Sequence, residues 1–394
     1  MNNTTFRFII ILSLLLPLLG AAQYVPGQSY FGANNYIEYI AGDLPIILVA
    51  PHGGYLEPDS LPTILNRGRD NGTLETTLLL MDSILTQTNG HRPHVIINHL
   101  FAGKMSASDE IDSAAGAHPD ARQAWNDFHD FIEDAKSEVT NVWSKGHYFE
   151  MHGNGHSEMW SEIGLGVSAA YLNGSDSLIL SRIERSTVKN LASQAGADFL
   201  EIIRGETSLG GLLDARGWNA VPSPSHPAPG AGGFFYAGWN TWLHGSRYEG
   251  TIDATHLENY FVFMQSGNRE AYAADLAESM LAFMEIHYGL ALGIDQKAVE
   301  IPARLELYQN YPNPFNPSTN IRYEIPVAGD VRIVVYDLAG REVSVLLNAS
   351  LSAGSYSVQW HGTDQNGVKL ASGVYFVKLL AGDLSRFIRL SLIS

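Results

Sequence analysis

Residues 45–54 read PIILVAPHGG, an apolar run that ends in a proline, a histidine and two glycines. A short run of this kind, bounded by turn-forming residues, is typical of a buried strand. We therefore expect a strand over residues 45–50 and a tight turn after it that carries His52. Residues 147–155 (HYFEMHGNG) repeat the pattern and place His152 at the end of a second strand.

Apolar runs and helical patterns alternate through the first three quarters of the chain. Further strands are expected over residues 94–100, 166–172, 198–203 and 256–261, and helices over residues 73–85, 119–143, 177–195 and 270–287. This alternation predicts an α/β fold, a mostly parallel sheet with helices on both faces. Sites in such sheets form at the carboxyl ends of the strands, where His52 and His152 are expected.

The composition changes near residue 300. Short alternating runs at residues 331–336, 355–360 and 373–380 are separated by Gly and Asn turn signals, and no helical pattern occurs among them. Regular short strands predict an all-β, immunoglobulin-like sandwich. The chain therefore divides into an α/β domain over residues 23–300 and a sandwich over residues 304–394.

The first 22 residues form a separate unit. One arginine precedes a 13-residue apolar run (FIIILSLLLPLLG, residues 8–20), and two alanines follow it. A transmembrane helix needs about 20 apolar residues, and Pro17 interrupts this run. The pattern predicts a secretory signal peptide over residues 1–22, cleaved after Ala22, and no stable membrane span.

Charge and residue usage exclude several classes of protein. With 24 Lys and Arg against 41 Asp and Glu, the formal net charge is −17, which argues against binding to nucleic acid. The chain contains no cysteine, so disulfides, thiolate metal sites and cysteine nucleophiles are excluded. The absence of a G-x-S-x-G elbow argues against a serine hydrolase.

Two imidazoles and one carboxylate indicate a metal centre. His52 and His152 are expected at strand ends, and Glu75 lies in the first turn of the helix predicted over residues 73–85. Such a set is typical of catalytic zinc, which keeps a fourth position for water and lowers the pKa of that water. Asp70, in the preceding loop, competes with Glu75 for the acidic position. The alternative role for both histidines is hydrogen bonding to carbonyl groups within their turns.

Several segments of the α/β domain share their order with a known family. They include APHGGYLEP (residues 50–58), RDNGTLETTLLL (69–80), FEMHGNGH (149–156) and GGFFYAGWNTWLHGS (232–246). This order resembles the N-formylglutamate amidohydrolases and their secreted relatives. The resemblance implies an α/β fold related to zinc carboxypeptidases, with one zinc ion (Zn²⁺) held by His52, Glu75 and His152. It also implies that Glu258 is the general base and that His244 belongs to the catalytic site.

The basic residues depart from that family's pattern. Arginines that bind substrate carboxylates are expected after the second strand, but residues 97–112 (INHLFAGKMSASDEID) contain only Lys104. Arg204, Arg216 and Arg247 remain as candidate partners of a carboxylate or oxyanion, or as surface ion-pair residues. The aromatic run FFYAGWNTW (residues 234–242) is expected either to line a substrate cleft or to pack in the core.

Motifs of the sandwich also follow a known order. They are YPNPFNPST (residues 311–319), VYDLAGREV (335–343), AGSYSVQWHGTDQNG (353–367) and LASGVYFVKLL (370–380). This order resembles the C-terminal sorting domain of type IX secretion substrates and is similar to the immunoglobulin-like module of flagellar hook-capping proteins. The resemblance implies export across the inner and outer membranes, with the bacterial outer-membrane secretion machinery as a partner. The alternative is a sandwich that binds a surface or a glycan.

These expectations describe a secreted or cell-surface, zinc-dependent amidohydrolase or peptidase with a small amide or peptide substrate. Glu258 is expected to activate the zinc-bound water, and zinc with His244 or an arginine to stabilise the oxyanion. The alternative is a non-catalytic surface binding or adhesion protein on a degenerate hydrolase fold. The sequence does not choose the substrate, the oligomeric state, the native metal or whether the sandwich is cleaved off.

Overall fold

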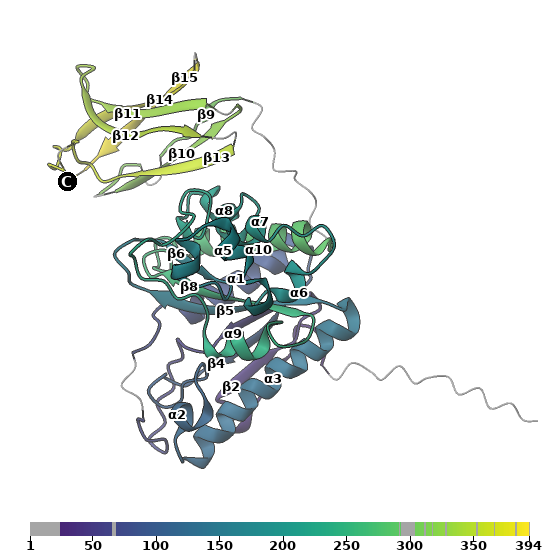
Figure 1. Ribbon diagram of the computed structural model, residues 1–394. Coiled ribbons are helices and arrows are strands. Elements are labelled where there is room, and N and C mark those ends of the chain that lie inside the picture. The colour runs from purple at the N-terminus through teal and green to yellow at the C-terminus, as the bar shows by residue number, and fades with distance from the viewer. Residues whose placement is uncertain are drawn as a thin grey trace, which may run out of the picture.

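The computed structural model describes residues 24–64, 68–290, 292, 304–310, 313–316, 318–327, 329–351, 354–365, 367–382 and 384–393. The predicted signal peptide and the boundary between the two predicted domains lie outside these residues. Among the residues described, no helix has the length and the apolar composition needed to cross a membrane. Figure 1 shows an α/β part, which comes first in the chain, and an all-β part.

The α/β part is built on an eight-stranded sheet with the order β1-β2-β4-β3-β5-β8-β6-β7. Its strands are β1 (Ser29–Phe31), β2 (Ile37–Ile40), β3 (Ile46–Ala50), β4 (His94–Asn98), β5 (Gly146–Asn154), β6 (Ser161–Gly164), β7 (Ala220–Val221) and β8 (Ile252–Tyr260). The four central strands β4, β3, β5 and β8 pair in parallel, and antiparallel pairings join β1, β2 and β6 to them. The mostly parallel sheet confirms the predicted α/β fold.

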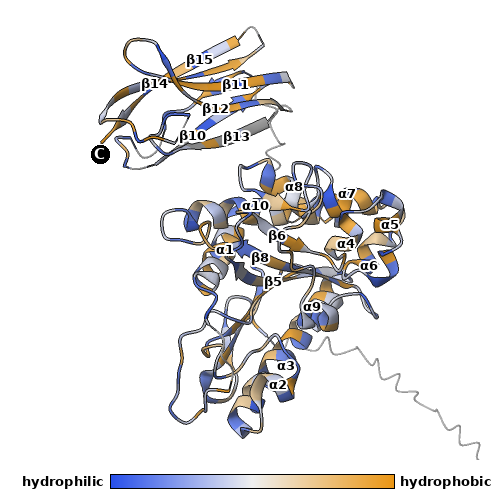
Figure 2. Ribbon diagram, turned by 60° about the vertical axis from the view of Figure 1, so that its left-hand side comes forward, coloured by the Kyte–Doolittle hydropathy of each residue, from blue (hydrophilic) through white to orange (hydrophobic). Residues whose placement is uncertain are grey.

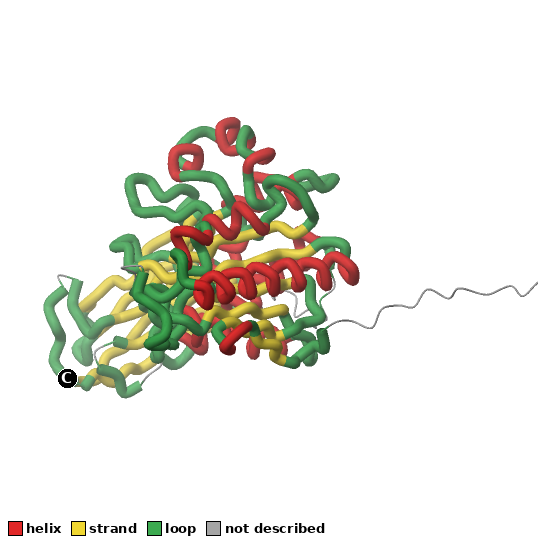
Figure 3. Tube along the Cα trace, turned by 90° about the horizontal axis from the view of Figure 1, so that it is seen from below, coloured by secondary structure: helices red, strands yellow, loops and turns green. Residues whose placement is uncertain are grey.

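Helices cover both faces of this sheet, which Figure 3 shows as yellow strands between red helices. They are η1 (Ala33–Asn35), α1 (Thr73–Gln87), α2 (Ile111–Ala115), α3 (Pro119–Trp143), α4 (Ala169–Leu172), α5 (Asp176–Leu180), η2 (Ile183–Arg185), α6 (Lys189–Ala192), α7 (Phe199–Arg204), α8 (Leu209–Asp214), α9 (Trp239–His244) and α10 (Arg269–Tyr288). The predicted helices over residues 73–85, 119–143 and 270–287 are confirmed as α1, α3 and α10.

Alternate residues of β3 belong to two different cores. Ile46 and Leu48 pack in the cluster that contains α1 and α10, whereas Ile47 and Val49 pack in the cluster that contains α3. Successive side chains of a strand point to opposite faces, so an entirely apolar strand requires cover on both sides. In Figure 2 the covering helices carry both hydrophilic and hydrophobic residues, as expected of helices with one buried face.

Three predicted elements are wrong. Residues 166–172 and 198–203, which were expected as strands, contain the helices α4 and α7. The Asp198 carboxylate accepts hydrogen bonds from the first backbone N–H groups of α7 at 3.0 and 3.2 Å, and such a cap favours a helix. Gly166 has a φ of 79°, which ends the extended path before α4. The long helix expected over residues 177–195 consists instead of α5, η2 and α6.

The all-β part consists of two antiparallel sheets, with the orders β13-β10-β9 and β12-β11-β14-β15. Their strands are β9 (Glu306–Leu307), β10 (Thr319–Ile325), β11 (Gly329–Tyr336), β12 (Glu342–Leu351), β13 (Gly354–Trp360), β14 (Gly373–Ala381) and β15 (Leu384–Leu392). Phe315, Ile333, Trp360 and Val377 are buried in its core. Helices are absent from the residues described here, so the all-β prediction is confirmed.

A buried histidine makes the stability of the α/β part depend on pH. His147, near the start of β5, contacts the hydroxyl oxygens of Tyr288 and Thr255 at 2.8 and 2.7 Å. Burial lowers the pKa of its imidazole to about 3, against about 6.5 in an unfolded chain. Between about pH 6.5 and pH 3, the unfolded chain binds a proton at His147 and the folded chain does not. The free energy of unfolding therefore decreases as the pH falls through this range.

We expect His147 to lower the free energy of unfolding by about 2 kcal/mol between pH 7 and pH 5. Chemical denaturation of the wild type and of His147→Gln at both pH values measures this, because the glutamine amide does not titrate. The variant should lose less stability on acidification by that amount, whereas His91→Gln, at an exposed position, should behave like the wild type. Equal pH dependence in all three proteins would contradict a neutral buried imidazole.

Candidate metal centre

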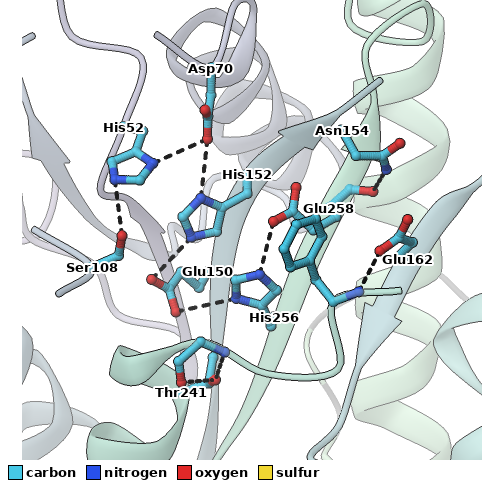
Figure 4. Close-up of polar contacts among 12 residues, drawn as sticks. His52, Asp70, Ser108, Glu150, His152, Asn154, Glu162, Thr241, His256 and Glu258 are labelled. Atoms are coloured by element: carbon cyan, nitrogen blue, oxygen red, sulfur yellow. Dashed lines mark hydrogen bonds and ion pairs between the residues drawn. The ribbon is translucent and has the colours of Figure 1, made fainter. Parts of the chain in front are cut away.

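Two histidines and an aspartate lie together at the carboxyl edge of the sheet (Figure 4). His52 follows β3, His152 lies near the end of β5, and Asp70 precedes α1. The Nδ1 atom of His52 is 3.3 Å from Oδ2 of Asp70, and Nδ1 of His152 is 3.1 Å from the same oxygen. Both histidines that the sequence analysis selected as metal ligands therefore converge on one carboxylate.

The carboxylate of this group belongs to Asp70 and not to Glu75. Glu75 lies in the first turn of α1, as expected, but its side chain contacts the hydroxyl group of Tyr55. The direction of a side chain on a helix is set by the helix backbone, whereas the loop before the helix brings Asp70 between the two strand ends. We therefore replace Glu75 by Asp70 in the candidate ligand set.

Both histidines also form hydrogen bonds through Nε2, the ring nitrogen that faces away from Asp70. Nε2 of His52 lies 2.9 Å from Oγ of Ser108 and 3.1 Å from Oγ of Ser106, and Nε2 of His152 lies 3.2 Å from Oε1 of Glu150. An imidazole that donates from Nε2 can offer the lone pair of Nδ1 to a metal ion, whereas without a metal ion Nδ1 of each ring donates to Asp70. Metal-binding histidines are commonly fixed in this way by a hydrogen bond on the far side of the ring.

The parallel pairing of β5 with β8 adds a third carboxylate, that of Glu258, next to His152. In the register of these strands, His152 is the partner of Glu258 and Glu150 is the partner of His256. Nε2 of His256 donates to Oε1 of Glu258 at 3.1 Å, and its Nδ1 is 3.8 Å from Oε2 of Glu150. The predicted general base Glu258 therefore lies beside the metal centre, oriented by a histidine.

The electrostatics of the centre favour a bound cation. Burial alone would raise the pKa of Asp70, but hydrogen bonds from His152 and His52 outweigh it and hold this pKa well below its usual range. Burial alone would also raise the pKa of Glu150, but hydrogen bonds from His152 and His256 hold it well below its usual range. Burial alone would lower the pKa of His152, yet Asp70 and Glu150 raise it well above its usual value. Two ionised carboxylates thus hold a positive charge at the position where a metal ion would bind.

The donor atoms fit a divalent transition metal. Among the residues that the structure describes, two groups of potential ligands have ligand atoms within 4.8 Å of one another: His52, Asp70 and His152, and Glu150, His152 and His256. The first group is the better catalytic candidate because the side chain of Asp70 is 22% exposed, whereas that of Glu150 is fully buried. Two imidazole nitrogens and a carboxylate oxygen are donors typical of catalytic zinc.

His244, which the resemblance placed in the catalytic site, has other contacts. It ends α9, and its Nε2 lies 2.8 Å from Nδ1 of His129 on α3. Its Nδ1 lies 2.8 Å from Oε1 of Glu133, also on α3. Ser246, two residues further along the chain, donates from its hydroxyl group to the carboxylate of Asp253 at 2.5 Å. These contacts join α9 to α3 and β8, so we remove His244 from the catalytic set and assign the H-G-S segment to packing.

The sequence analysis did not select Glu150 and His256, although the alternation of side chains along a strand places them on the same face as selected residues. Each stands two residues before a selected residue, Glu150 before His152 and His256 before Glu258. Side chains two apart on a strand share a face. The patterns E-x-H and H-x-E therefore predict that each pair of side chains shares a face of its strand. Only the pairing of β5 with β8 shows that the two pairs lie side by side.

A family comparison gives a match for the all-β part of the chain. Residues 318–383 match the FlgD Ig-like domain family. Together with the two antiparallel sheets, this match gives the all-β part an immunoglobulin-like fold, and it fits an extracellular or surface protein. A comparison of the chain with curated proteins gives no match.

Three solved structures are similar to parts of this chain. Dimeric latent PorU from Porphyromonas gingivalis shares 19% identity over 23% of this chain and 10% of PorU, with a TM-score of 0.20. FlgD from P. aeruginosa shares 26% identity over 19% of this chain and 58% of FlgD, with a TM-score of 0.16. A gene product from Agrobacterium tumefaciens shares 13% identity over 64% of this chain and 95% of that protein, with a TM-score of 0.38. This chain spans about a tenth of the length of PorU.

Metal content distinguishes the two candidate carboxylate ligands. We expect about one metal ion per purified wild-type chain, loss of that ion in Asp70→Ala, and retention in Glu75→Gln, measured by inductively coupled plasma mass spectrometry after zinc loading and dialysis. Removing the outer partner in Glu150→Gln should weaken metal binding by about 10- to 100-fold. The opposite pattern, with metal lost only in Glu75→Gln, would restore the ligand set derived from the sequence.

Proposed function

We propose that this chain is a secreted zinc-dependent hydrolase that cleaves an amide or peptide bond. The observation that carries the proposal is the convergence of the two Nδ1 atoms of His52 and His152 on Asp70, with Glu258 on the neighbouring strand. Catalytic zinc sites in hydrolases combine three protein ligands with a nearby carboxylate that handles the proton. The N-formylglutamate amidohydrolase resemblance of residues 45–265 supports the same class of reaction.

Each residue of the centre has a distinct task in this proposal. His52, Asp70 and His152 would hold the metal, and Ser108 and Glu150 would keep the two imidazole rings in the ligating tautomer. Bound zinc supplies Lewis acidity towards the substrate carbonyl and lowers the pKa of water.

Glu258 takes a proton from the attacking water and returns it to the departing nitrogen, as a general base and then a general acid. His256 donates to one oxygen of Glu258, so the other oxygen is left to receive the proton. Glu258 is 7% exposed and Glu150 is not exposed at all. A carboxylate that keeps some access to solvent suits proton transfer, whereas a fully buried one suits orientation of the His152 ring on the side away from the metal.

The immunoglobulin-like part supports the location of this enzyme in the proposal. Its match to the FlgD Ig-like family fits a protein that acts outside the cell or at the cell surface. Its sequence resemblance to type IX sorting domains leads us to propose the outer-membrane secretion machinery as its partner. A hydrolase released by this route would meet its amide substrate outside the cell, which suits a chain without oxidisable thiols.

Replacement of Glu258 tests the reaction independently of the metal. Amine release from a panel of N-acyl amino acids, short peptides and N-acylated amino sugars with and without a carboxylate would be followed with fluorescamine for the wild type, Glu258→Gln and the exposed control Glu270→Gln. We expect Glu258→Gln to lower kcat by about 10²- to 10⁴-fold with unchanged metal content, and Glu270→Gln to match the wild type.

Activity that survives in Glu258→Gln would remove this residue from the mechanism. A wild-type chain that binds zinc tightly but releases no amine from any member of the panel would favour the alternative, a binding protein on a hydrolase fold.

A further inference from the structure

An open cavity outside the metal centre is lined mainly by aromatic residues. Its volume is about 440 Å³, and its walls are Tyr236, Trp239, Trp242, Leu243, Arg247 and Tyr248. Tyr236, Leu243 and Tyr248 are 38%, 47% and 67% exposed. Large side chains that remain exposed side by side, rather than singly, mark a surface that meets a ligand. The volume is within the range of small-molecule sites.

One arginine gives this cavity a charge. The guanidinium carbon of Arg247 lies 4.0 Å from the ring centre of Trp242 and 5.5 Å from that of Tyr248. The other two arginines left open by the sequence are engaged, Arg204 with Asp176 and Arg216 with Glu278. Among the described residues, no carboxylate lies within ion-pair distance of Arg247. A stacked guanidinium with no acidic partner offers a planar, bidentate site for the carboxylate of a ligand.

The segment that lines the cavity also contacts His256, the residue that orients Glu258. The backbone N–H of Phe235 donates to Glu162 at 2.6 Å, and the ring of Phe235 lies 6.5 Å from that of His256. A Cβ atom on Gly238 would come within 2.9 Å of Nδ1 of His256. Tyr236, which lines the cavity, is two residues from Gly238, a backbone distance of at most about 7 Å.

We infer that this cavity binds a sugar ring that carries a carboxylate, and that such a sugar is part of the substrate. The second half of this inference rests on the proposed hydrolase function. The flat C–H face of a pyranose ring packs on aromatic rings, while its hydroxyl groups reach the polar edges of Tyr and Trp. Arg247 selects the acidic sugar over a neutral one. The scissile amide would then be attached to a uronic or carboxylated amino sugar rather than to a free amino acid.

Isothermal titration calorimetry with a trimer of galacturonic acid as the acidic probe and a trimer of galactose as the neutral probe tests the cavity. Binding would be measured in the Asp70→Ala background, so that neither metal nor hydrolysis contributes. We expect the acidic probe to bind at least tenfold more tightly than the neutral one, and more weakly as salt rises. Trp242→Ala should lose binding of both probes by at least tenfold. Arg247→Gln should lose only the preference for the acidic probe, and Arg247→Lys should keep part of it.

Phe387→Ala, which removes a 74% exposed aromatic ring from the all-β part, is the matched control and should bind like its parent. Failure of both probes to bind would overturn the inference, as would binding that Trp242→Ala leaves unchanged. Tighter binding of N-benzoyl-glycine than of the acidic sugar would assign the cavity to peptides. None of these results bears on the metal-content or Glu258 experiments, so the two proposals fail separately.

Discussion

The parallel pairing of β5 with β8 is the constraint on which the candidate site depends. One register places His152 beside Glu258 and Glu150 beside His256. A shift by one residue would turn one member of each pair to the opposite face of the sheet. The apolar residues between them, Met151 and Leu257, are buried in the core below and fix the register. Hydrophobic burial in the sheet thus holds four polar side chains in one row.

That row could not persist without compensation of its charges. Glu150 is fully buried and Asp70 and Glu258 are mostly so, and burial of an unpaired carboxylate is costly. Histidines alternate with these carboxylates in space, and each carboxylate contacts at least one imidazole. The carboxylates favour a positive charge beside Asp70, as on His152, which is the electrostatic reason that we propose a cation site at this edge of the sheet.

The segment around Gly238 connects the two proposed sites. Only a residue without a side chain fits against His256 at this position. The close approach holds Tyr236 and Trp239, which line the aromatic cavity, within two residues of a position that contacts His256. We propose that a substrate with one group in this cavity extends towards Glu258, the hydrogen-bond partner of His256. In these proposals, side chains at the ends of the strands carry out the reaction, whereas the segment around Gly238 and helix α9 select the substrate.

The sequence by itself determined the class of fold and selected the two histidines of the candidate metal centre, because buried strands and the turns after them leave a local pattern. It also placed Glu258 on a strand, and the sandwich followed from regular short strands. Only the tertiary structure chose Asp70 over Glu75, assigned His244 to packing and brought Glu150 and His256 into the site. These outcomes depend on contacts between segments up to about a hundred residues apart in the chain. The helices α4 and α7 were missed for a related reason, since short apolar runs do not distinguish strands from helices until caps and packing decide between them.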